Sequence, residues 1–238
     1  MLKRIATTCL CIPLFGCFES SQATFWEGYV YTQTETGLEA LPNAFTELYD
    51  IEGTLLTTGI VPNGRPSNFN QLILEDGWAD QPCTLRVGGD ESQTIQWAGR
   101  IPTGAATWIP GAVFGIEPSF LNAFFNSFAE PAGVILEDAV HLWGEPLYPT
   151  EWIGAEFLLI DIDGTEYPIY PYSQLDTGLI SSNTTEKIDW FFAWNLPAKP
   201  LILTVSMPDG RSIETTYHPK QGDILSALYY TLPSVEEE

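Results

Sequence analysis

The chain has 238 residues, of which 45% are hydrophobic and 13% aromatic, so it can bury packed cores and is not a disordered tether. Its 31 Asp and Glu against nine Lys and Arg give a formal net charge of −22. This charge argues against nucleic acid and anionic lipid head groups as direct partners, because both would be repelled. A solvated acidic surface is the simplest interpretation, and attraction of cations or basic partners is the alternative.

The N-terminus has the pattern of a secretory signal. Lys3 and Arg4 precede an apolar run at residues 5–15, which is far shorter than the ~20 residues that a helix needs to cross a bilayer. The run ends in Leu14-Phe15-Gly16-Cys17. This ending resembles the lipobox of bacterial lipoproteins, in which cleavage follows the small residue and the cysteine is acylated. An ordinary cleaved signal that happens to precede a cysteine is the alternative.

The lipoprotein resemblance implies how the chain is held. Residues 1–16 would be removed as a lipoprotein signal peptide, Cys17 would carry lipid, and residues 17–24 would form a lipidated spacer. Two or more acyl chains hold a protein firmly on a membrane. The two residues after the cysteine are Phe18 and Glu19. Neither is the Asp that retains lipoproteins at the inner membrane in enteric relatives. The resemblance therefore favours the cell envelope, and within it the outer membrane.

The four cysteines do not form a disulfide framework. Cys9 and Cys11 lie in the predicted signal and Cys17 is the predicted lipid acceptor, so Cys83 remains alone. Cys83 begins a strand-like run at residues 83–87. We expect it to be a buried small hydrophobe rather than a reactive thiol.

Short segments rich in aromatic and β-branched residues follow the spacer, and nearly all are bounded by Gly, Pro, Asn or Asp. The predicted strands are residues 25–31, 44–49, 55–61, 69–74, 83–87, 94–98 and 112–116, with a polar loop at 32–41. Many short strands separated by turns are typical of an all-β sandwich.

One segment breaks this pattern. Five large apolar side chains recur at helical spacing before Pro131: Phe120, Leu121, Phe124, Phe125 and Phe128. The spacing predicts a short amphipathic helix at residues 119–128. We expect its apolar face to pack on the adjoining sandwich rather than on a membrane or a partner.

The sequence contains an internal duplication. Residues 44–54 read AFTELYDIEGT and residues 155–165 read AEFLLIDIDGT, with six of eleven positions identical at an offset of 111. Residues 71–97 align without gaps to residues 189–215 at an offset of 118. The difference of seven residues predicts an insertion within residues 166–187 of the second copy. Two copies of one sandwich are the simplest explanation.

The second copy also shows a recognisable order of elements. A strand pair turns at residues 161–165, and a strand and a loop at 195–200 follow. In the next strand, Leu201, Leu203 and Val205 share one face, while Ile202 and Thr204 share the other. This order resembles the carboxypeptidase-regulatory or transthyretin-like sandwich, a seven-stranded Greek key that is frequent in bacterial lipoproteins. The family's motifs carry no catalytic residues.

The resemblance implies an all-β fold of two tandem Greek-key β-sandwiches joined by the short Phe-rich helix. The predicted sandwiches span residues 25–117 and 133–233. The linker helix spans residues 118–132, and residues 234–238 form an acidic tail.

Two acidic turns are candidate cation sites. Asp161 and Asp163 precede Gly164, and two acids likewise precede Gly53 in the first copy. Calcium requires clustered oxygen ligands, but neither copy has an acid at the closing position of a twelve-residue calcium loop. Hairpin turns that use Asp and Gly explain both copies equally well. Asp161 and Asp163 are therefore weak metal candidates, and no cofactor is expected.

No catalytic signature is present in the sequence. His141 and His218 have no carboxylate or cysteine at ligand spacing, so a zinc site is not expected. The sequence contains no G-x-S-x-G elbow, H-E-x-x-H helix or phosphate loop. Adjacent acids are common in so acidic a chain, so a hydrolase pair cannot be distinguished from surface charge. We expect no enzymatic activity.

A Tyr-Pro-rich run at residues 167–172 is the candidate ligand site. Tyr167, Tyr170 and Tyr172 are the tentative binding residues, because exposed rings on a β-sandwich stack on sugars or grip peptides. The prolines in the run are unfavourable in a central strand. Core packing is the alternative, and it is favoured for the aromatic strand at 190–194.

These observations predict a non-catalytic, membrane-anchored envelope lipoprotein with a structural, adhesive or accessory-subunit role. The lipid on Cys17 would attach it to the membrane, and its partner would be an envelope protein or a glycan, not nucleic acid. The alternative function is a carbohydrate- or peptide-binding module that uses exposed aromatic residues of the second domain.

Overall fold

The computed structural model describes residues 24–34, 36–74, 77–90, 92–101, 106–116, 136, 138–174, 180–182 and 184–230. Some predictions fall outside these residues. They are the signal peptide and lipidation at Cys17, the Phe-rich helix and the acidic tail.

The described chain is all-β, as the sequence predicts. The strands of the first half are β1 (Thr24–Thr34), β2 (Gly37–Ala40), β3 (Phe45–Asp50), β4 (Leu55–Thr58), β5 (Phe69–Leu74), β6 (Pro82–Gly88), β7 (Ile95–Arg100) and β8 (Ala106–Ile116). Those of the second half are β9 (Val140–Pro146), β10 (Glu156–Asp161), β11 (Glu166–Tyr167), β12 (Tyr170–Gln174), β13 (Ile180–Ser181), β14 (Trp190–Leu196), β15 (Leu201–Ser206), β16 (Ser212–Tyr217) and β17 (Ile224–Tyr230).

Helical structure is minor in this part of the chain. The short 3₁₀ turn η1 (Pro149–Trp152) precedes β10 and buries Trp152. Within the described ranges, no helix has the length and apolar character needed to span a membrane.

The predicted loop at residues 32–41 is wrong. β1 extends to Thr34, and β2 turns back to pair with it antiparallel, with Thr34 opposite Gly37. Gly37 adopts a φ of +134°, which allows the chain to reverse there. The segment is polar because this hairpin is mostly exposed, and its β-branched Thr residues suit a strand.

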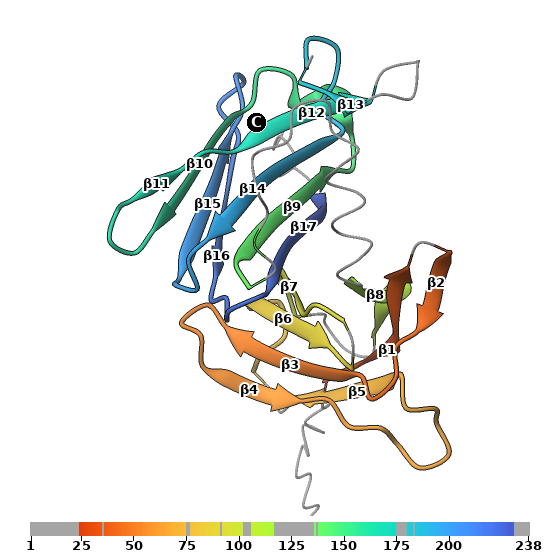
Figure 1. The fold of residues 1–238 in the computed structure, drawn as a ribbon. Helices are drawn as coiled ribbons and strands as arrows, with labels where there is room; N and C mark the ends of the chain where they lie inside the picture. The colour runs from red at the N-terminus through yellow and green to blue at the C-terminus, as the bar shows by residue number, and fades with distance from the viewer. Residues whose placement is uncertain are drawn as a thin grey trace, which may run out of the picture.

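The first half places two sheets around one apolar core (Figure 1). In one sheet, β1 pairs antiparallel with β2 and β5 and parallel with β8. The other sheet has the order β4-β3-β6-β7. Both sheets contribute to the buried cluster, which includes Trp26, Val30, Leu48, Leu72, Leu74, Cys83, Leu85 and Val87.

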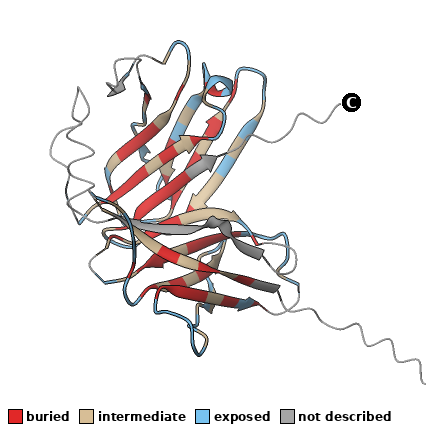
Figure 2. Cartoon of the chain, turned by 90° about the vertical axis from the view of Figure 1, so that its right-hand side faces the viewer, coloured by how far each residue is buried: buried red, intermediate tan, exposed pale blue. Residues whose placement is uncertain are grey.

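The second half repeats this arrangement. One sheet has the order β11-β10-β15-β16, and the other has the order β13-β12-β14-β9-β17, in which β17 lies parallel to β9. Its core includes Val140, Leu142, Leu159, Phe191, Ala193, Leu201, Leu203, Val205, Tyr217 and Leu225. Figure 2 shows buried residues along the strands of both halves.

The two halves share one continuous sheet. Residues 224–226 of β17 lie parallel to residues 95–97 of β7, so nine strands run in the order β13-β12-β14-β9-β17-β7-β6-β3-β4. Each half keeps its own apolar cluster, but Ala98 on β7 packs against the cluster of the second half. Backbone pairing and side-chain packing therefore both cross the boundary.

The strand register follows the duplication found in the sequence. Leu48 lies opposite Leu85, and at the two sequence offsets Leu159 lies opposite Leu203. All six residue pairs between β3 and β6 recur in this way between β10 and β15. The predicted insertion at residues 166–187 contains the β12–β13 hairpin, which extends the sheet beyond β14.

Candidate functional site

The predicted tyrosine site is divided between two sheets. Tyr167 lies on β11, and its hydroxyl donates a hydrogen bond of 2.9 Å to Oδ2 of Asp161. Tyr170 and Tyr172 lie on β12, in the opposite sheet of the second half. The hydrogen bond gives Tyr167 a structural role in the hairpin, apart from the other two rings.

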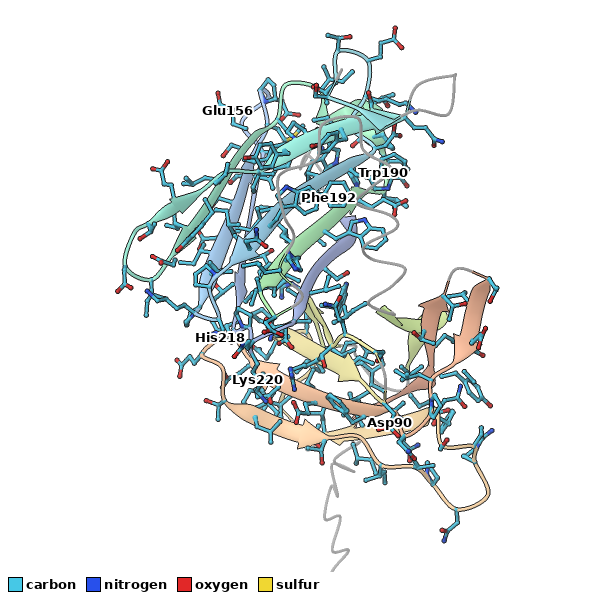
Figure 3. The ribbon with its side chains drawn as sticks, viewed as in Figure 1. Asp90, Glu156, Trp190, Phe192, His218 and Lys220 are labelled. Carbon is cyan, nitrogen blue, oxygen red and sulfur yellow. The ribbon has the colours of Figure 1, made fainter. Side chains whose placement is uncertain are left out.

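Tyr170 and Tyr172 also differ in exposure. Tyr172 is only 5% exposed, and its ring centroid lies 5.8 Å from that of Phe192. Phe192, which is labelled in Figure 3, is buried on β14. Its ring stacks on that of Trp194, with 5.1 Å between the centroids. Tyr170 is 39% exposed, so it is the member of the predicted set that solvent reaches most.

The predicted metal residue Asp161 organises a hairpin turn. Its Oδ1 accepts hydrogen bonds of 2.9 Å from the backbone N–H groups of Asp163 and Thr165. Its Oδ2 accepts the Tyr167 hydroxyl and lies 3.8 Å from Nζ of Lys199. The hydrogen bond from Thr165 is the main cause that lowers the pKa of Asp161, and Tyr167 and Lys199 act in the same direction.

Lys199 fills the position between the two acids of this turn. Its Nζ lies 2.7 Å from Oδ2 of Asp163, which is the shorter of its two ion pairs. Across the described residues, no group of three or more His, Cys, Asp or Glu has a geometry that could hold a metal ion. The carboxylate contacts of this turn are those of a hairpin stabilised by its own backbone and by a lysine.

The first copy of the turn has the same backbone geometry. Oδ1 of Asp50 accepts hydrogen bonds from the N–H groups of Glu52 and Thr54 at 2.9 and 2.8 Å. Gly53 and Gly164 both adopt a φ of +80°, which favours glycine. The repeated D-x-[DE]-G-T sequence is therefore a repeated turn.

His141 is buried and takes part in a local hydrogen-bond network. The N–H of Asn195 donates to Nδ1 at 3.3 Å, and Nε2 lies 3.1 Å from the carbonyl oxygen of Leu136. These partners fit a neutral ring protonated on Nε2. Burial lowers the pKa of His141, although the Leu136 carbonyl opposes this shift.

Cys83 is buried in the first core, as expected. Burial raises the pKa of its thiol to about 12, so the reactive thiolate is scarce at neutral pH.

A cluster of charged side chains lies at the boundary between the halves. Arg86 on β6 donates from Nε and Nη2 to the two carboxylate oxygens of Asp223 at 3.1 and 3.0 Å. Asp223, which directly precedes β17, has a side chain only 1% exposed. A third donor, Nη1 of Arg86, contacts Glu47 at 3.0 Å. Burial opposes the charge on Arg86, but the two carboxylates outweigh it and raise its pKa.

Lys220 closes the cluster on its outer side. Its backbone N–H donates to Asp223 at 2.9 Å, and its Nζ lies 3.5 Å from the Glu47 carboxylate. The Tyr49 hydroxyl donates to Glu47 at 2.8 Å. Burial would raise the pKa of Glu47, but the hydrogen bonds from Tyr49 and Arg86 and the charge of Lys220 lower it. Figure 3 shows Lys220 and His218 at this boundary.

His218 connects the same loop to a strand and a turn of the first half. Its backbone exchanges two hydrogen bonds with the Gln96 side chain, at 2.9 and 3.0 Å. Its Nε2 lies 2.8 Å from the carbonyl oxygen of Ile51 in the Asp50 turn. Together with the Arg86 cluster, these contacts define a boundary clamp formed by Glu47, Tyr49, Arg86, Gln96, His218, Lys220 and Asp223.

Sequence reasoning missed the boundary clamp. The sequence held one partial signal, the opposite charges of Glu47 and Arg86 on two predicted strands, which the fold places opposite each other. Nothing in the sequence placed Asp223 beside them. The clamp fixes one half of the chain against the other. It is therefore the candidate functional site, with a structural rather than a chemical role.

Comparison with known proteins does not assign the chain to a family. No family model matches the sequence, and no curated protein matches it. Among solved structures, that of GBS52, the minor pilin of the Gram-positive pathogen Streptococcus agalactiae, is similar over 90% of this chain and 100% of that chain. The identity is 9% and the TM-score is 0.23, a likeness too low to support an argument about this chain.

Proposed function

We propose that the protein is a non-catalytic envelope lipoprotein whose folded body is a stiff, two-lobed scaffold or accessory subunit. The boundary clamp is the observation that carries this proposal. A flexible pair of domains has a small polar interface between its parts. Here a shared sheet and a buried two-point ion pair join the halves instead. A body of this kind transmits position and load rather than opening around a substrate.

Each half is taken to be one transthyretin-like Greek-key sandwich, produced by duplication of a single unit. The repeated register of β3 with β6 and β10 with β15 supports this assignment, as does the repeated Asp-Gly turn. Lipid on Cys17 would hold this body on the outer membrane.

The experiment that tests the scaffold role measures how much protein is needed. We expect deletion to lower the resistance of the cells to detergent, because an envelope scaffold is lost. Expression of the protein should restore resistance in proportion to its amount, because a scaffold is needed in a fixed ratio to its partner. Full resistance at a small fraction of the normal amount would instead indicate an enzyme. Cys17→Ser, expressed at the normal level, should not restore resistance.

The second candidate is a carbohydrate- or peptide-binding module of the second domain. The exposed ring of Tyr170 at the β12–β13 edge favours it. A glycan array with the purified body tests this function directly. Specific retention that is lost in Tyr170→Ala would support binding, and absence of retention would reject the glycan version.

A further inference from the structure

The sheet β11-β10-β15-β16 has one face on the core and one outer face. Its inner face packs on the core of the second half through Leu159, Leu203 and Val205. Strand residues alternate between faces, so the neighbouring side chains point outward. In chain order, the outward residues are Glu156, Leu158, Ile160, Glu166, Ile202, Thr204, Ser206, Ser212, Glu214 and Thr216.

The centre of this outer face is apolar. Ile160 lies opposite Ile202, and Leu158 is the next outward residue on β10, with 41% of its surface exposed. Antiparallel sheets that cover one core present polar residues on the other side. The core of the second half therefore does not explain why three large aliphatic residues lie together here.

The equivalent face of the first half contacts other residues of the protein. At the sequence offsets of 111 and 118, Leu158 corresponds to Glu47 and Thr204 corresponds to Arg86. Glu47 and Arg86 belong to the boundary clamp, in which Arg86 also pairs with Asp223 at the start of the second half's last strand. The same face of the repeated unit is thus an interface in the first copy and is exposed in the second.

Charge decides what kind of partner fits. Three acids border the apolar centre: Glu166 lies opposite Ile160, Glu214 lies opposite Thr204, and Glu156 lies two residues before Leu158. None of the outward residues of this face is basic. A second copy of the chain would bring the same acids against them and would be repelled, since the chain carries a net charge of −22.

We propose that this face, defined by Leu158, Ile160 and Ile202 with Glu156, Glu166 and Glu214 around them, docks a protein partner that presents apolar residues bordered by Lys and Arg. The docking deepens the proposed accessory-subunit role and rests on it. Figure 3 shows Glu156 at the outer margin of the second half, away from the boundary with the first.

The test is site-specific photo-cross-linking of the full chain in intact cells. The probe amino acid p-benzoylphenylalanine replaces Leu158 in one variant and Leu55, which is 48% exposed on β4, in the matched control. We expect a discrete cross-linked product at position 158 and none at position 55. Mass spectrometry should assign it to another protein through a peptide that contains Lys or Arg.

Charge variants then show whether the product depends on the acids. Combining Glu156→Lys, Glu166→Lys and Glu214→Lys should reduce the product at least about tenfold, because like charges oppose each other across the interface. Replacing the same three residues by Gln should reduce the cross-linked product less. The Gln variant serves as the control in case the Lys variant does not fold. Circular dichroism melting confirms that each variant is folded.

Three results would overturn the proposal: no product specific to position 158, a product that contains a second copy of this chain, or a product that the charge reversal leaves unchanged in a folded variant. Each is distinguishable from failure of the proposed function, because the expression titration and Cys17→Ser do not involve this face.

Discussion

Arg86 and Asp223 form a two-point ion pair between residues 137 positions apart, with nitrogen–oxygen distances of 3.1 and 3.0 Å. Arg86 belongs to the first half and Asp223 precedes the strand that joins the second half to it. A planar guanidinium and a carboxylate match in one relative orientation, so the pair fixes the angle between the halves as well as their separation.

Arg86→Ala should destabilise the protein by about 3–5 kcal/mol, because it leaves the buried Asp223 carboxylate without its charge partner. Urea unfolding followed by circular dichroism measures the loss. The matched control is Arg100→Ala, since Arg100 pairs with Asp80 at 3.5 Å where both side chains are exposed. The control should lose less than about 1 kcal/mol. Equal losses in the two variants would contradict the structural role of the pair.

The repeated turn could be predicted from the sequence because all its determinants are local. Asp161, Gly164 and Thr165 lie within five residues and specify the hairpin through hydrogen bonds to their own backbone. The apolar alternation of Leu201 and Leu203 likewise fixes which face is buried, and with it the register. The insertion within residues 166–187 could be predicted because the offset between the two copies changes from 111 to 118.

The boundary clamp could not be predicted, because its residues are ordinary polar residues until the fold brings them together. Asp223 follows a turn and reads as a surface acid, yet it is buried by contacts with Arg86 and Lys220. The parallel pairing of β17 with β7 is also invisible, since a strand sequence does not specify its neighbour at such separation. The division of the three tyrosines could not be predicted for a related reason, because it depends on which sheet each strand joins: Tyr167 and Tyr172 lie on opposite sheets.

His141 should make stability depend on pH. Burial lowers its pKa below the ordinary value of 6.5, so the unfolded chain binds a proton more readily than the folded chain. Stability is therefore full above about pH 6.5 and falls as the pH decreases toward the lowered pKa, by at most about 1.4 kcal/mol per pH unit. The pKa of Glu145 is raised by burial, so its contribution to stability has the opposite pH dependence: it decreases as the pH rises.

Urea unfolding between pH 7.5 and 5.5 measures this dependence, and His141→Gln provides the comparison. Gln cannot be protonated in this range, so the part of the slope that belongs to His141 should disappear, whatever the stability of the variant at pH 7.5. A slope that is the same in both proteins would show that other groups cause it.

The tyrosines of the predicted ligand site should separate into structural and exposed classes. Tyr172→Ala should cost about 3 kcal/mol, because it removes a buried ring that packs against Phe192. Tyr170→Ala should cost less than about 1 kcal/mol, because its ring is 39% exposed. Thermal unfolding of the two variants measures the difference. A large loss for Tyr170→Ala would assign that ring to the core and remove the binding alternative.

Cys17→Ser should abolish attachment to the membrane. Two or more acyl chains hold a protein firmly on a bilayer, and serine cannot accept the thioether-linked lipid. Phase separation of whole-cell extracts in a cloud-point detergent measures the change: the natural protein should enter the detergent phase and the variant the aqueous phase. Cys83→Ser is the control, because Cys83 is buried in the first core and should not affect partitioning. Unchanged partitioning of Cys17→Ser would exclude the anchor.

Gly53 and Gly164 offer a comparison that isolates the boundary clamp. Both occupy the same position of the repeated turn at a φ of +80°, so replacement by Ala should cost each about 1–2 kcal/mol in backbone strain. A Cβ on Gly164 would meet no atom within 4 Å, whereas one on Gly53 would lie 2.8 Å from Nδ1 of His218. Because the His218 ring is held at the Ile51 carbonyl, it cannot move away without breaking that contact. Gly53→Ala should therefore lose at least about 1 kcal/mol more than Gly164→Ala in urea unfolding. Equal losses would mean that the ring rearranges without cost and that His218 does not hold the halves together.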